Sequence, residues 1–129
     1  MSPEELAVRA RQAALRSYSP YSRFRVGAVV LDDGGELYEG CNVENAAYGS
    51  SICAEATAIS GAVARGVRKI VGIAVACVDA ADENGAYPCG NCRQLMNEFG
   101  TRWVVVTAGE GSEVRHHEFD GLHPYGFSL

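Results

Sequence analysis

The chain has 129 residues, 47% of them hydrophobic and 21% charged, which fits one domain, residues 1–129, built around one core. This composition excludes an intrinsically disordered or collagen-like chain. The formal net charge of −5 argues against a basic face for a nucleic-acid polymer, although it leaves room for a small neutral ligand. No apolar run reaches the roughly 18 residues that cross a bilayer, and no signal peptide opens the sequence. We therefore expect a soluble, cytoplasmic protein without a membrane partner.

The first third of the chain predicts a helix followed by a β-hairpin. Residues 2–5 read Ser-Pro-Glu-Glu, a capping-box sequence with proline at the first helical position, so a helix begins here and runs to about residue 16. Apolar residues alternate with others over 24–30, as in a half-buried strand. Polar residues and two glycines at 32–35 predict a turn, after which residues 36–43 pair back as a second strand.

The rest of the chain alternates helices with apolar strands. Residues 44–51 are polar and small and predict a loop, and the tail from 121 to 129 has no periodicity. The expected elements are helices over 53–65 and 89–99, buried strands over 70–78 and 103–107, and a more exposed strand over 113–119. This order predicts an α/β protein, a three-layer α/β/α sandwich around a central mixed sheet of about five strands.

Five cysteines, an odd number with one close pair, favour metal binding or redox chemistry over disulfides in a reducing compartment. Cys89 and Cys92 lie three residues apart in the first turn of a predicted helix and project toward the same side. Cys53 begins another predicted helix, and the N-terminus of a helix lowers the pKa of a thiol. If both helices pack on one face of the sheet, these sulfurs can meet around one zinc ion and leave its fourth position open for water. Glu55, two residues after Cys53, is placed to move protons rather than to bind metal.

These residues resemble the signature of the zinc-dependent nucleoside and base deaminases, in which Cys-x-Glu is followed downstream by Pro-Cys-x-x-Cys. The chain is more closely similar to cytidine deaminases of the short-subunit, homotetrameric type, from about residue 15 to Phe127. The motifs that carry this likeness are Pro-Tyr-Ser at 20–22, Phe-x-Val-Gly-Ala at 24–28, Asn-Val-Glu-Asn at 42–45 and Pro-Cys-Gly-x-Cys-Arg-Gln at 88–94.

The resemblance implies an enzyme that hydrolyses cytidine and 2′-deoxycytidine to the corresponding uridine and ammonia, in pyrimidine salvage. It implies one Zn²⁺ per subunit, held by Cys53, Cys89 and Cys92, with Glu55 as the catalytic residue. Water made nucleophilic by the metal would attack C4 of the pyrimidine, while Glu55 moves the water proton to N3 and helps ammonia leave.

The resemblance also assigns substrate contacts. Asn42 and Glu44 are expected to hydrogen-bond the ribose hydroxyls of a pyrimidine nucleoside. The backbone of Ala54 is expected to hold the base, and Phe24 to line its face. On spacing alone, Asn42 and Glu44 would be ordinary solvent-facing groups near a strand end and Phe24 a core residue, so these roles depend on the family likeness.

Two aromatic residues are expected to act across a subunit boundary. By the resemblance, Tyr48 and Phe127 close the site of a neighbouring subunit, which implies a homotetramer with shared active sites.

Many relatives carry an arginine after the glutamate of the Cys-Ala-Glu motif, where this chain has Ala56. Three thiolates on Zn²⁺ sum to −1, so we expect the two helix ends, together with Arg93, to supply the missing offset. The tail also departs from the family pattern, with His123 in place of a leucine.

The residues leave other interpretations open. Cys89 and Cys92 after a proline also suit a dithiol redox site, and Cys41 could complete a closed structural zinc site of four cysteines in a binding module. Within the deaminases, an enzyme for blasticidin-type or otherwise modified nucleosides is the nearest rival, although the run at 42–45 favours ribose recognition. The redox and four-cysteine alternatives differ from a deaminase in whether zinc is retained and in how many sulfurs hold it.

The remaining cysteines and histidines are expected to be structural. Cys77 lies in the most apolar strand and is predicted to be a small core residue, and the same is expected of Cys41. His116 and His117 are adjacent, so in a strand they point to opposite faces and cannot easily share a metal. We expect both histidines at the surface.

Overall fold

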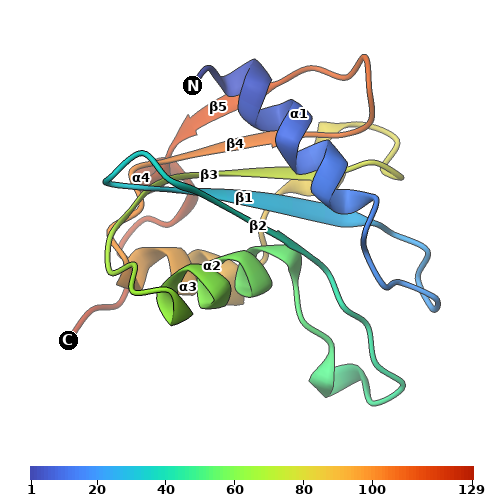
Figure 1. Cartoon of the computed structure of the whole chain (residues 1–129), viewed down its shortest axis with the longest axis horizontal. Coiled ribbons are helices and arrows are strands. Elements are labelled where there is room, and N and C mark those ends of the chain that lie inside the picture. The colour runs from blue at the N-terminus through green and yellow to red at the C-terminus, as the bar shows by residue number, and fades with distance from the viewer.

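Five strands form one mixed sheet in the order β2-β1-β3-β4-β5 (Figure 1). The computed structural model describes all of residues 1–129. Only β3 and β4 are parallel neighbours, and the other pairs are antiparallel. The strands are β1 (Val26–Asp32), β2 (Leu37–Cys41), β3 (Ile70–Cys77), β4 (Trp103–Thr107) and β5 (Arg115–Glu118).

Helices cover both faces of this sheet. The helix α1 lies on one face, and α2 and α3 lie together on the other (Figure 1). The predicted three-layer α/β/α architecture with a mixed five-stranded sheet is therefore confirmed. None of the helices is long and apolar enough to span a bilayer. The helices are α1 (Pro3–Ala14), α2 (Ala54–Ala64), α3 (Gly90–Glu98) and α4 (Phe119–Leu122), with short 3₁₀ turns η1 (Tyr48–Ser50) and η2 (Glu83–Ala86).

The helix α1 begins where its capping box predicts. The Ser2 hydroxyl accepts from the backbone N–H of Glu5 at 3.2 Å, and the Glu5 carboxylate accepts from the N–H of Ser2 at 3.4 Å. Its buried side chains are one leucine and four alanines, so the helix packs close to the sheet. A Cβ on Gly27 of β1 would lie 2.1 Å from the carbonyl oxygen of Ala10, which explains why glycine is required there.

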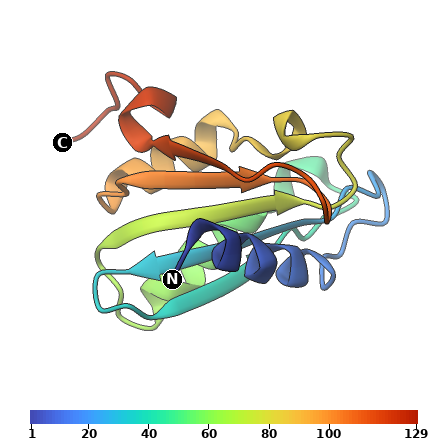
Figure 2. The same cartoon turned by 90° about the horizontal axis from the view of Figure 1, so that it is seen from above.

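Strand directions place the starts of α2 and α3 at the same edge of the sheet. The strands β2, β3 and β4 all run the same way, because β1 is antiparallel to both β2 and β3 while β4 is parallel to β3. The helix α2 follows β2, and α3 follows β3 after η2, so both begin beyond the carboxyl ends of strands. In Figure 2, β3 and β4 point toward the end of the molecule where η2 lies. Open α/β sheets commonly place their sites at this edge.

The larger of two apolar cores lies under α2 and α3. It fixes the two helices against the sheet and against each other, since they share buried side chains between them. Its largest fully buried members are Ile70, Ile73 and Met96, together with the valines Val30, Val75, Val104 and Val106.

The observed elements differ from the expected ones mainly at their ends. The first strand runs over 26–32 rather than 24–30, and the second runs over 37–41 rather than 36–43. The helix α4 was not predicted, since the sequence indicates a strand over residues 113–119 and an irregular tail after it. A helix of one turn carries too few residues to show a helical period.

Candidate active site

Three sulfur atoms meet at the edge where α2 and α3 begin. Cys53 is the N-cap residue of α2, Cys89 is the N-cap residue of α3, and Cys92 lies in the first turn of α3. Their Sγ atoms all lie within 4.8 Å of one another. Zinc bound tetrahedrally at about 2.3 Å from each sulfur would hold sulfurs about 3.8 Å apart, so the cluster fits this ion.

The cluster also favours a deprotonated sulfur. A hydrogen bond from the Cys92 thiol is the main reason that the pKa of Cys53 is lowered to about 6. The same interaction raises the pKa of Cys92 above its ordinary value. Both helix N-termini add partial positive charge at this point. Because metals bind thiolate rather than thiol, these groups are prepared for a cation.

Glu55 lies beside the sulfurs in the first turn of α2. It is only 5% exposed, and burial is the main cause that raises the pKa of its carboxyl group to about 7. The neighbouring Cys53 adds to this increase through charge repulsion. A carboxyl group that titrates near neutrality can both accept and return a proton.

A cavity of about 180 Å³ opens onto this group of residues. Cys53, Ala54, Glu55 and Cys89 line it at the helix ends, and the remaining walls are mostly apolar. The other lining residues are Val26 and Val75 of the sheet, Asn42, and the segment Gly85, Ala86 and Tyr87. A small, mainly apolar hollow with a few convergent polar groups is typical of a site for a small molecule.

Asn42 lines the cavity, but its side chain also holds the start of β1. Its Nδ2 donates to the carbonyl of Phe24 at 2.8 Å, and its Oδ1 accepts from the N–H of Val26 at 2.9 Å. The Ser17 hydroxyl donates to the same oxygen. The structure thus places Asn42 at the cavity with its amide fixed in orientation.

Glu44 lies in a separate hollow that also contains Tyr48. Its carboxylate accepts from the N–H groups of Tyr21 and Ser22 at 2.9 and 3.1 Å and from the Ser22 hydroxyl. The hydrogen bond from Ser22 is the main cause that lowers the pKa of Glu44. In the single chain this residue fixes a loop, and it does not line the cavity of Glu55.

The aromatic residues of the predicted site are not brought to this cavity within one chain. Phe24 and Tyr48 are exposed, Tyr48 at 81%, and neither lines it. Phe127 is 66% exposed, and its carbonyl accepts from Gln94 and Asn97 of α3 at 2.9 and 2.8 Å. These hydrogen bonds fix the tail on α3 and leave the Phe127 ring free for a contact outside the chain.

Tyr87 and His117, neither of which was assigned to the site from the sequence, lie at or next to the cavity. Tyr87 lines the cavity, and its hydroxyl is hydrogen-bonded to Nε2 of His117 at 2.8 Å. His116 is exposed, as expected, whereas His117 is half-buried against this tyrosine. The alternation of a strand placed His117 and His116 on opposite faces, but nothing local in the sequence indicates the distant partner.

The remaining cysteines and Arg93 lie outside the sulfur cluster. Cys77 is fully buried, as predicted, while Cys41 is half-buried, with its Sγ directed at the carbonyl of Arg16 at 3.5 Å. Cys41 therefore does not supply a fourth sulfur. Arg93 donates to the carbonyls of Pro88 and Leu122 at 2.8 and 2.6 Å, so it braces the segment that leads into Cys89.

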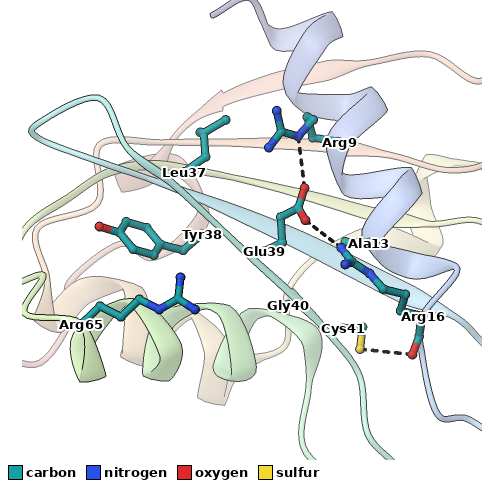
Figure 3. Close-up of a pocket in the computed structure, with 9 residues that line it drawn as sticks. All are labelled: Arg9, Ala13, Arg16, Leu37, Tyr38, Glu39, Gly40, Cys41 and Arg65. Atoms are coloured by element: carbon teal, nitrogen blue, oxygen red, sulfur yellow. Dashed lines mark hydrogen bonds and ion pairs between the residues drawn. The ribbon is translucent and has the colours of Figure 1, made fainter.

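A different hollow of about 360 Å³ lies along β2, between α1 and α2 (Figure 3). Glu39 points into it toward α1 and forms ion pairs with Arg9 and Arg16 at 3.1 and 2.7 Å. Two of its three arginines thus share its one carboxylate, and its one thiol, Cys41, faces a backbone carbonyl. The groups able to bind metal and move protons belong to the smaller cavity at the helix ends.

Comparison with known proteins agrees with this geometry. The family model described as the cytidine and deoxycytidylate deaminase zinc-binding region matches residues 1–108. The chain belongs to this deaminase family. It is 44% identical over 130 residues to a cytidine deaminase of Sporosarcina psychrophila, across 99% of this chain and 93% of that one. It is 39% identical over 120 residues to a cytidine deaminase of Mycobacterium tuberculosis H37Rv, across 93% and 85%.

Solved structures of the deaminase family show the same fold. The crystal structure of cytidine deaminase from Burkholderia pseudomallei superposes with a TM-score of 0.88 at 40% identity, covering 98% of this chain and 100% of that one. That of the Mycobacterium tuberculosis enzyme gives 0.80 at 34% identity, covering 100% and 99%. The zinc-binding region of the family includes the three clustered cysteines and Glu55, whereas His117 and Phe127 lie beyond the matched residues.

Proposed function

We propose that this chain catalyses the zinc-dependent hydrolysis of cytidine and 2′-deoxycytidine to uridine and 2′-deoxyuridine, with release of ammonia, in cytoplasmic pyrimidine salvage. One observation carries the proposal: sulfurs from two helix N-termini lie within 4.8 Å of one another beside a buried carboxyl group. The names of the relatives support the reaction class, since those compared above are described as cytidine deaminases.

The metal centre proposed is one Zn²⁺ per chain. Cys53, Cys89 and Cys92 would hold it, and no fourth metal-binding side chain joins their cluster. This donor set is that of an open, catalytic zinc site rather than a closed structural one. When bound, zinc supplies Lewis acidity that makes a water molecule nucleophilic at neutral pH.

Glu55 is proposed to carry the protons of the reaction. It would take a proton from the attacking water and deliver it to N3 of the pyrimidine ring, and it would then carry the second water proton to the amino nitrogen. The bond between C4 and that nitrogen breaks, so that cytidine and water become uridine and ammonia. The burial of Glu55 limits exchange of its proton with bulk water, and this directs the transfer toward the bound ligand.

Substrate recognition is proposed for four further residues. Asn42 and Glu44 would bind the ribose hydroxyls, the backbone of Ala54 would hold the base, and Phe24 would line its face. The positions of Asn42 and Ala54 on the cavity wall support their roles. Glu44 and Phe24 lie outside that wall, so their roles rest on the family resemblance.

We further propose a homotetramer whose active sites are shared between subunits. The exposed aromatic side chains of Tyr48 and Phe127 would each reach into a neighbour's cavity. Both rings are exposed, at 81% and 66%, and are therefore free to contact a partner. The oligomer would thus supply the aromatic walls that the single chain lacks.

A panel of free pyrimidines tests the proposed function. The purified protein is incubated with cytidine, 2′-deoxycytidine, cytosine and cytidine monophosphate, and loss of ultraviolet absorbance and release of ammonia are followed. We expect turnover of the two nucleosides, loss of turnover after treatment with a chelator, and its return when zinc is added. An absence of activity on both nucleosides in zinc-loaded protein, or full activity in metal-free protein, would contradict the proposal.

A further inference from the structure

The cavity beside Glu55 ends, on the side of β4 and β5, in a segment that β5 holds in place. The turn η2 packs on β3 and β4, and Gly85, Ala86 and Tyr87 all line the cavity. The Tyr87 ring meets the His117 ring edge-on, with 5.2 Å between centroids, and their polar atoms are 2.8 Å apart. The Tyr87 ring is therefore held by a residue that lies outside the cavity.

A second set of contacts fixes the other end of the same segment. Arg115 donates to the carboxylate of Glu83 at 2.9 Å and to the side-chain oxygen of Asn84 at 3.0 Å. It also lies 3.4 Å from the Tyr87 hydroxyl. Since Arg115 and His117 are two residues apart on a strand, they point to the same face of β5. One strand face thus holds both ends of the segment from Glu83 to Tyr87.

The order of the strands shows which end of a substrate this wall would meet. Asn42 and Val26 line the cavity from the side of β1 and β2, whereas Tyr87 reaches it from the side of β4 and β5. In a pyrimidine nucleoside the sugar on N1 and the amino group on C4 lie at opposite ends of the ring. A sugar bound near Asn42, as in the function proposed above, directs the amino group toward Tyr87.

We propose that Tyr87, positioned by His117 and Arg115, is a specificity-determining residue that limits the size of the substituent on the exocyclic nitrogen of the substrate. The inference rests on the proposed function. Hydrolysis of N4-methylcytidine consumes water and gives uridine and methylamine, so it requires room for one added methyl group beside the C4 nitrogen. The contacts with His117 tie the Tyr87 ring to β5, which keeps this residue in place beside the cavity.

The test compares kcat/KM for cytidine and for N4-methylcytidine, with uridine as the common product. Tyr87→Ala removes the ring, Tyr87→Phe removes only the hydroxyl that His117 holds, and His117→Ala removes the support. We expect Tyr87→Ala to raise the ratio of N4-methylcytidine to cytidine by roughly tenfold or more, the order that one methyl group is worth in a fitted pocket. Tyr87→Phe and His117→Ala are expected to move the ratio in the same direction by less.

A matched control is Tyr38→Phe, which removes a hydroxyl that donates to Asp32 at 3.2 Å, away from the cavity, and leaves the ratio unchanged. Zinc content is measured for every variant, and Tyr87→Leu serves for the comparison if the alanine variant loses zinc. A ratio within twofold of wild type in a zinc-loaded Tyr87→Ala or Tyr87→Leu protein would overturn the inference alone. Failure of the wild-type protein to deaminate cytidine would instead overturn the proposed function, and the inference with it.

Discussion

Arg25 and Asp79 form a double hydrogen-bonded ion pair between the start of β1 and the segment that follows β3. The Nε and Nη2 atoms of Arg25 donate to the two carboxylate oxygens of Asp79, each at 2.9 Å, and the Arg25 backbone N–H donates to the same carboxylate at 2.8 Å. The pair joins the two chain segments that flank the carboxyl end of β3, from which the chain continues to Cys89. It therefore helps to fix the edge of the sheet where α2 and α3 begin.

This pair predicts a pH dependence of stability. The hydrogen bond from Arg25 lowers the pKa of Asp79 below its ordinary value, so the folded state favours the ionised carboxylate. Its contribution is complete above the unfolded-state pKa of about 3.9 and is lost as the pH falls through the lower folded-state pKa. In urea unfolding, Asp79→Asn should be less stable than wild type at pH 7, and the difference should shrink below about pH 4. Asp33→Asn, in an exposed turn, is the control, and an equal difference for Asp79→Asn at every pH would contradict this account.

Substitution of Glu55 separates proton transfer from metal binding. Glu55→Gln keeps the size of the side chain and leaves the three sulfurs untouched, so zinc content and the melting temperature should change little. Turnover should fall by about 10²-fold or more, since general acid–base catalysis is lost. Steady-state kinetics together with metal analysis make the comparison, with Glu4→Gln on the exposed side of α1 as the control. Substantial residual activity would show that another group moves the proton.

The cysteines are expected to fall into two classes when each is replaced by alanine. Cys53→Ala, Cys89→Ala and Cys92→Ala should each lose most of the bound zinc, because each removes one of three clustered sulfurs. Cys41→Ala should retain zinc, since its sulfur lies outside the cluster. Metal content of the purified proteins decides between the classes. Release of zinc by Cys41→Ala would favour a closed site of four cysteines instead.

Close packing of α1 on the sheet predicts a large effect of one added methyl group. Gly27→Ala would place a Cβ 2.1 Å from the carbonyl oxygen of Ala10, so the free energy of unfolding should fall by about 1–3 kcal/mol or more. Gly61→Ala, in an exposed position within α2 with no atom near the new Cβ, should raise it by about 0.5–1 kcal/mol. Urea unfolding measures both. Equal stability of the two variants would contradict the packing described for α1.

The sequence predicted most of the elements and the residues of the sulfur cluster, because these depend largely on local signals. The capping box fixed the start of α1, and cysteines at the starts of two helices could be expected to meet once both helices were placed on one face of the sheet. The carboxylate of Glu55 followed from its position two residues after Cys53.

Contacts between distant segments could not be predicted in the same way. The pairing of Tyr87 with His117 depends on β5 lying at the sheet edge beside η2, which no spacing in the chain encodes. The hydrogen bonds of Arg93 to the carbonyls of Pro88 and Leu122 are a further example, and its expected offset of the thiolate charge stays a prediction. Tyr48 and Phe127 are likewise exposed in the single chain, and their proposed contacts lie in a neighbouring subunit.

The most direct test of the central claim is X-ray absorption at the zinc edge, recorded on the zinc-loaded protein without substrate. The account predicts three sulfur neighbours at about 2.3 Å and one lighter neighbour, oxygen, at about 2.0 Å. Four sulfur neighbours, or fewer than three, would contradict an open site built by the starts of α2 and α3.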